Sequence, residues 1–158
     1  MAIRTPLVLN AGRIQQLQSG DALASTPELK SFTNDNAGSL VIGAPVYMTA
    51  ADHVNKAQAN ATGTCDVVGL VYDTTIGTGA AGNVIVDGVM TATTTQWDAV
   101  AGTSGGLTFN TIYYLDPATV GKITATPPAT AGQFSVLVGR ALSTTELELT
   151  LPGQVIAL

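Results

Sequence analysis

Residues 77–90 read GTGAAGNVIVDGVM, and this stretch decides between two very different folds. Its first six residues have the glycine spacing G-x-G-x-x-G, which in a dinucleotide-binding fold joins a buried strand to a helix. Asp98 follows at about the distance of the ribose-binding carboxylate in such a fold. The residues after the third glycine are NVIVDG, however, a β-branched run that is broken by an Asp-Gly turn signal.

A crossover helix of about a dozen residues does not fit behind these glycines. Asp73, Thr74 and Thr75 also occupy the place where a buried entry strand should end. We therefore interpret the glycines as a connection between two antiparallel strands, where a positive φ is needed. The sequence predicts neither a NAD or ATP site at residues 77–82 nor any other cofactor.

Strand patterns continue on both sides of this stretch. The segment LELTL alternates apolar and polar residues at the period of a half-buried strand, and TIYYL is rich in β-branched and aromatic residues. Short turn-forming strings separate these segments. The spacing predicts an all-β fold, either an antiparallel β-sandwich or a small β-barrel. The strongest strand segments are residues 45–48, 66–72, 84–90, 111–115 and 147–151.

Helical patterns are sparse. Residues 12–20 could form two helical turns, but Asn10, Ala11 and Gly12 equally resemble a hairpin turn between PLVL and RIQQL. Residues 93–102 allow one short helix.

A weak internal repeat runs through the chain. Tyr47 aligns with Tyr114 at an offset of 67 residues, and residues 67–71 align with residues 137–141 at an offset of 70. The difference fits a longer loop in the second copy. Similarity of this strength also arises by chance in low-complexity β sequences. If the repeat is real, two such units bury their apolar faces by packing on one another.

We expect the chain to be organised as an N-terminal arm followed by one β-rich domain. The extended arm or attachment segment comprises residues 1–30, and the domain comprises residues 31–158. Within the domain the pseudo-repeats span about residues 40–90 and 107–151.

The composition is unusually poor in charge. Hydrophobic residues make up 46% of the 158 residues and charged residues only 11%, against a typical charged share of about 25%. The net charge is −5, and the six Lys and Arg residues form no basic cluster, so we expect no nucleic-acid partner. No apolar run approaches the roughly 20 residues of a membrane helix, and the first residues lack a signal-peptide core, so we expect no membrane partner and synthesis in the cytoplasm.

Few residues suggest chemistry. Asp52-His53 is the one place where a histidine adjoins a carboxylate in the sequence, and a solvated turn is the simpler interpretation. Cys65 has no local base, which favours a small residue in an apolar strand over a nucleophile. Trp97 is expected to fill the core or to anchor a partner. No catalytic residue and no metal ligand are assigned, and we expect the chain not to be an enzyme.

Two segments resemble structural proteins of tailed bacteriophages. PLVLNAGRIQQLQSGDAL, residues 6–23, is similar to an N-terminal segment that recurs on such proteins. Residues 113–149, which begin YYLDPATVGKIT, resemble a β module of head-fibre, capsid-decoration and tail-fibre proteins. The resemblance implies a non-enzymatic, oligomeric virion protein, made in the bacterial host cytoplasm, with a trimer favoured. The family carries no catalytic residues, so none are transferred.

This resemblance predicts a decoration (cement) or head-fibre subunit that binds the outer surface of the capsid, with the major capsid protein or other virion subunits as partners. Two alternatives remain open. One is a tail, collar or baseplate component that serves as an adaptor for fibres. The other is a fibre module that binds host carbohydrate, for which Trp97, Tyr113 and Tyr114 would form the aromatic platform.

The predicted contact with the partner is the apolar N-terminal segment, which could add a strand to the edge of another subunit's sheet. It could equally be the first strand of the domain's own sheet. The predicted contact residues are Ile3, Arg4, Pro6, Leu7, Val8 and Leu9.

Overall fold

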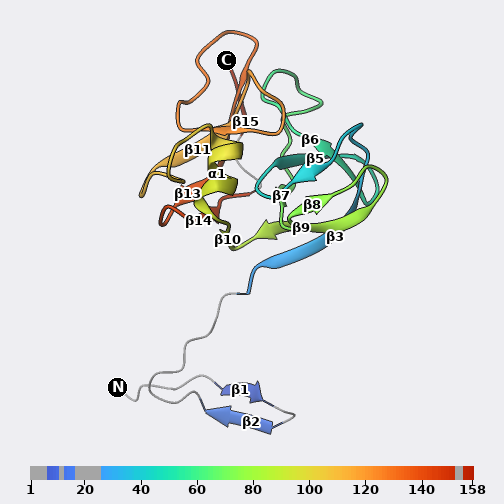
Figure 1. Ribbon diagram of the computed structural model, residues 1–158, viewed down its shortest axis with the longest axis vertical. Coiled ribbons are helices and arrows are strands. Elements are labelled where there is room, and N and C mark those ends of the chain that lie inside the picture. Colours follow the sequence, from blue (N-terminus) through green and yellow to red (C-terminus); the bar gives the residue numbers. More distant parts are fainter. Residues whose placement is uncertain (1–6, 11–12, 17–25, 152–154) are drawn as a thin grey trace.

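In the computed structural model, residues 7–10, 13–16, 26–151 and 155–158 are described, and the statements below concern these residues. They form β-strands and one short helix, which confirms the predicted all-β fold (Figure 1). The strands fall into two larger sheets and two short pairs. One short pair is the hairpin of β1 (Leu7–Asn10) and β2 (Arg13–Gln16). The hairpin alternative for residues 10–13 is therefore confirmed.

The first larger sheet is a closed barrel, which we call the first unit. Its neighbours run β3-β6-β5-β7-β9 and back to β3. All pairs are antiparallel except β3 with β6, whose short parallel contact joins Thr33 to His53 and Asn34 to Val54. The strands are β3 (Glu28–Asn34), β5 (Pro45–Ala50), β6 (His53–Lys56), β7 (Gly69–Val71) and β9 (Ala81–Asp87).

The second larger sheet, which we call the second unit, is open. Its neighbours run β10-β14-β13-β11-β12, and β15 (Val155–Ala157) pairs with β13. In β14 the side chains alternate between buried and more exposed positions, as the sequence predicts for LELTL. The strands are β10 (Val89–Thr91), β11 (Ile112–Leu115), β12 (Ile123–Thr124), β13 (Phe134–Ala141) and β14 (Glu146–Leu149).

The two units have the same strand order. In each, the first strand in the chain pairs with the fifth, the fifth with the fourth, the fourth with the second and the second with the third. Val46 faces Gly69 in the first unit, and Tyr113 faces Gly139 in the second. These two pairs are related by the same offsets, 67 and 70 residues, that align the sequences. The bounds of the arm and of the repeats stay predictions, and β3 already begins at Glu28, inside the predicted arm.

The Asp-Gly signal at residues 87–88 marks the passage from one unit to the other. β9 ends at Asp87 in the barrel, and β10 begins at Val89 in the second sheet. Gly88 has a φ of 103°, which side chains rarely adopt, and a Cβ there would lie 3.1 Å from Pro27. A glycine therefore suits both the backbone and the space at this crossing.

Helix α1 (Thr94–Ala101) lies over the second sheet (Figure 1). Its start is fixed by a capping box, in which the Thr93 hydroxyl accepts from the Gln96 amide and the Gln96 side chain accepts from the Thr93 amide. Its end is closed by Gly102 in the left-handed conformation. Trp97 is fully buried and donates its Nε1 proton to the Thr145 carbonyl at 3.0 Å. The helix permitted by residues 93–102 is thus present, and Trp97 fills the core.

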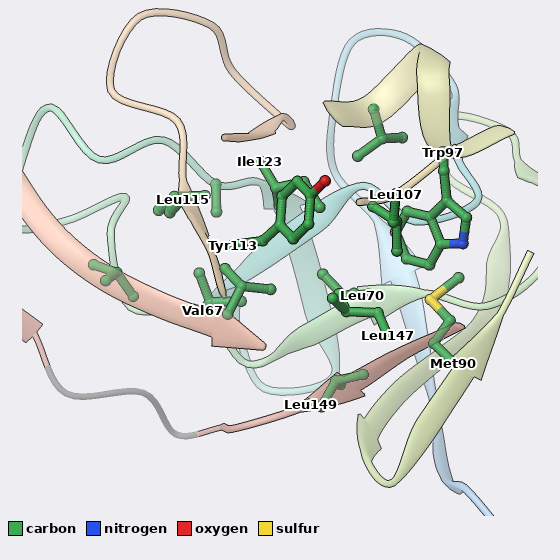
Figure 2. Close-up of a cluster of buried hydrophobic side chains, with 14 of the residues drawn as sticks. Val67, Leu70, Met90, Trp97, Leu107, Tyr113, Leu115, Ile123, Leu147 and Leu149 are labelled. Carbon is green, nitrogen blue, oxygen red and sulfur yellow. The ribbon is translucent and has the colours of Figure 1, made fainter. Parts of the chain in front are cut away.

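The largest buried cluster belongs to both units. Leu70 of β7 packs in one cluster with Tyr113, Leu147 and other residues of the second unit (Figure 2). Ile85 of β9 belongs to the same cluster. A smaller cluster fills the barrel itself and includes Phe32, Val46, Val54 and Val84. The short pair of β4 (Leu40–Val41) and β8 (Thr75–Ile76) contributes Leu40 and Ile76 to this smaller cluster.

We predict that Gly69→Ala and Gly139→Ala destabilise the protein to a similar degree. A Cβ at Gly69 would meet the Ile85 carbonyl oxygen, and a Cβ at Gly139 would meet the Glu148 carbonyl oxygen. Relieving a clash with backbone costs about 1–3 kcal/mol, measurable by urea denaturation. Gly63→Ala is the matched control, because a Cβ at Gly63 meets nothing within 4 Å. Equal stability of all three variants would contradict the prediction.

Candidate partner-binding surfaces

The glycine-rich loop is followed by a strand, not by a helix. Gly79 has a φ of 72° and donates its amide proton to the Asn34 carbonyl at 2.8 Å. Gly82 is already inside β9, where a Cβ would lie 2.5 Å from the Ile76 side chain. The prediction that the loop joins two antiparallel strands was wrong in one respect. β8 pairs with β4 while β9 pairs within the barrel, so the loop connects two different sheets.

His53 has a carboxylate partner that the sequence did not reveal. Its Nδ1 lies 2.7 Å from Asp35 Oδ1, and the other oxygen of Asp35 accepts from the Thr49 hydroxyl at 2.6 Å. These bonds, that from Thr49 first, hold the pKa of Asp35 below its usual value. Thr49 donates to the carboxylate and not to the imidazole, so the group lacks the arrangement of an activated nucleophile. The adjacent Asp52 is exposed in a turn with a φ of 60°.

Cys65 and Asp98 serve the structure of loops. Cys65 is buried, and burial raises the pKa of its thiol. It lies ahead of β7 and not within a strand, because β7 begins only at Gly69. The Asp98 carboxylate accepts from the amides of Gly106 and Gly105 and from the Thr103 hydroxyl, at 2.7–3.0 Å. The Gly106 bond contributes most to lowering the pKa of Asp98. Asp98 thus closes the loop after α1.

Across the described residues, no group of three or more His, Cys, Asp or Glu side chains is placed to hold a metal ion. In the same part of the chain, no helix is long and apolar enough to cross a membrane. The surface features that stand out are apolar instead.

An apolar groove of about 470 Å³ lies between the barrel and the end of the second sheet. Met48, on its wall, is 48% exposed, and the Asp66 side chain adds a negative charge at the surface. The lining residues are Tyr47, Met48, Thr62, Gly63, Asp66, Val67, Val68, Val86 and Leu151.

Phe109 is the most exposed of the large hydrophobic residues described, at 71%. It projects from the turn of residues 108–111, in which Thr111 donates its amide proton to the Thr108 carbonyl. Asn110, with a φ of 60°, donates its amide proton to Ala141 and accepts from Arg140 Nη1 at 3.0 Å. Hydrogen bonds to Ala141 and Arg140 therefore hold the turn against β13, while its phenyl ring faces solvent.

A third apolar feature of the surface lies along β15. Its Val155 and Ile156 are 43% and 49% exposed, and Leu158 behind them is 44% exposed. β15 pairs with Phe134–Val136 of β13 along one edge. The described strands leave its other edge unpaired, which is a site where another chain can add a strand.

The predicted partner-contact residues are only partly visible. Leu7, Val8 and Leu9 form β1 and pair with Gln16, Gln15 and Ile14 of β2. In the part of the chain that the structure describes, β1 pairs with no other strand. Ile3, Arg4 and Pro6 lie outside the described residues. Whether these six residues contact a partner stays a prediction.

The aromatic platform considered for carbohydrate binding was wrong. Trp97 and Tyr113 are both fully buried. The Tyr113 hydroxyl accepts from the Thr108 amide at 3.0 Å, and the Trp97 ring packs in the core. Tyr114, which alternates with Tyr113 along β11, is partly exposed. A single partly exposed ring does not make a stacking platform.

No model of a known protein family matches the chain, and no curated protein matches its sequence. Among solved structures, the chain is similar to a chain in the capsid of Myoviridae phage XM1, with 20% sequence identity and a TM-score of 0.47. The match covers 84% of this chain and 89% of that chain.

We predict that Asp98→Asn lowers the melting temperature at pH 7 and has less effect in acid. The folded protein lowers the pKa of Asp98, so its stabilising contribution is present above the unfolded pKa of about 3.9 and is lost as the pH falls through the lower folded value. Melting curves of both proteins between pH 7 and pH 2 measure this. A difference that is unchanged at the acid end would contradict the prediction.

Proposed function

We propose that this chain is a non-enzymatic structural subunit of a bacteriophage virion, either a capsid decoration protein or a head-fibre subunit on the outer capsid surface. The observation that carries the proposal is apolar surface left open on a charge-poor protein. The groove, the Phe109 turn and the β15 edge are separate places of this kind. Exposed apolar patches bordered by polar residues are typical of sites for protein partners.

The resemblance of residues 6–23 and 113–149 to phage structural proteins supports a virion as the assembly. In this role the protein adds buried area across neighbouring capsid subunits. Each copy contributes a modest binding free energy, and many copies together resist the internal pressure of the capsid. The major capsid protein is the partner in this proposal, and the subunit acts as a homo-oligomer, for which the resemblance favours a trimer.

The N-terminal hairpin is the proposed attachment element. Its strand β1 pairs with β2 and with no other described strand, so the outer edge of β1 can pair with a strand of the capsid. The side chains of residues 3–9 are largely apolar, with Arg4 as the one charge.

Deleting residues 1–9 tests this attachment. We expect the truncated protein to melt at the same temperature as the full chain, because both buried clusters consist of residues from Phe32 onward. We expect it to lose co-sedimentation with phage particles that lack the native subunit. Undiminished co-sedimentation would refute the role of the arm, whereas a lower melting temperature would place residues 1–9 in the domain's own sheet.

A tail, collar or baseplate adaptor is the second candidate, since the resemblance includes tail-fibre proteins. The same experiment separates the two if isolated heads and isolated tails are offered in parallel. Binding of the full chain to heads alone is expected. Binding to tails alone would favour the adaptor.

A further inference from the structure

The Phe109 turn is built as a rigid projection. The aromatic ring is held outward by a turn whose backbone and Asn110 side chain make hydrogen bonds to β13 and β11. Because the turn is already ordered, a partner that covers the ring does not have to immobilise the backbone first. Aromatic and arginine side chains are enriched at the centres of protein interfaces, and Arg140 is joined to the same turn by its hydrogen bond to Asn110.

The groove has complementary properties. Its volume of about 470 Å³ falls in the range of drug-sized ligand sites, so it is large enough for a phenyl ring. Its walls are mainly apolar, with Met48, Val68, Val86 and Leu151 among them. Asp66 on the same groove is exposed and negative. Arg140 makes no ion pair with a carboxylate of the described residues, and the groove offers it one on another copy.

The ring and the groove of one copy lie at opposite ends of β14. The turn of Phe109 bonds to Ala141, which pairs with Leu147 near the start of β14. The groove is lined by Leu151, beyond its end. From Leu147 to Leu151 an extended chain covers roughly 13 Å, more than the reach of one phenylalanine side chain. The groove of one copy is therefore open to the ring of a second copy.

We propose that Phe109 of one copy inserts into the groove of a second copy, where Arg140 pairs with Asp66. The contact joins two different patches, so each copy offers one projection and one groove. Contacts of this kind repeat from copy to copy until a closed ring leaves neither patch free. The inference concerns self-association of the isolated protein, and it does not rest on the proposed place in the virion.

Sedimentation of the purified full-length chain tests the contact. The wild type is expected to associate with rising concentration. Phe109→Ser, Met48→Lys and Asp66→Lys should each weaken the association by about 30-fold or more, as loss of a central interface residue does. Val120→Ser and Glu28→Lys are the matched controls, since these residues are exposed and lie outside both patches. Controls should associate as the wild type does, and all variants should keep its melting temperature.

Mixing two defective variants gives the sharper test. Phe109→Ser retains the groove, and Met48→Lys retains the projection, so each alone is expected to be monomeric. Their equimolar mixture should form a one-to-one complex and nothing larger, because only one productive contact is left. Absence of that complex would overturn the proposal. A wild type that stays monomeric up to about 1 mM would overturn it too, and if Phe109 were then needed for binding to phage particles, the projection would belong to a different protein partner.

Discussion

The core that the two units share is the interaction on which the rest of the structure depends. The side chains of Leu70 and Ile85, on barrel strands, pack in one cluster with residues of the second sheet. A Cβ at Gly43, near the barrel strand β5, would lie 3.2 Å from the Trp97 ring, so this backbone passes close to the indole. A fully buried leucine or tryptophan is worth about 1.5–3 kcal/mol relative to an exposed one. The barrel buries a smaller cluster of its own, but Leu70 and Ile85 are buried in the cluster that the second unit completes. Each sheet therefore shields apolar side chains of the other from water.

The same strand order gives a closed barrel in the first unit and an open sheet in the second. In the first unit the parallel contact of β3 with β6 completes a barrel. In the second unit the corresponding strands, β10 and β12, do not pair with each other among the described residues. Helix α1 follows β10. Its Ala99 carbonyl accepts a hydrogen bond from the side chain of Lys122, next to β12. The helix thus contacts the strand that in the first unit completes the barrel, and its buried residues are Trp97 and Val100.

The buried polar side chain that the structure describes is matched by hydrogen-bond partners. Asn34, the buried polar residue among those described, donates to the carbonyls of Ile76 and Gly38 and accepts from the amide of Asn36. Leaving such a group unpaired would cost about 1–3 kcal/mol. The surface, by contrast, has few charges to repel neighbouring molecules and carries exposed apolar residues such as Phe109.

The sequence by itself determined the local features, because they depend on residues close together in the chain. The alternation in LELTL, the hairpin at residues 10–13 and the strand after GTGAAG follow from short-range backbone preferences. The offsets of 67 and 70 residues also relate the Val46–Gly69 pair to the Tyr113–Gly139 pair, although the repeat itself stays a prediction.

Only the tertiary structure decided which side chains meet. His53 pairs with Asp35 because the parallel contact of β3 and β6 brings together segments 18 residues apart. Both tyrosines suit a strand, but Tyr113 is buried and Tyr114 is partly exposed. The reason is that the largest buried cluster lies on only one face of β11. Phe109 has the composition of a core residue and yet faces solvent, since its turn is fixed by bonds to β13, some 30 residues later. Contacts of this kind depend on how distant strands are arranged, and no local pattern encodes that arrangement.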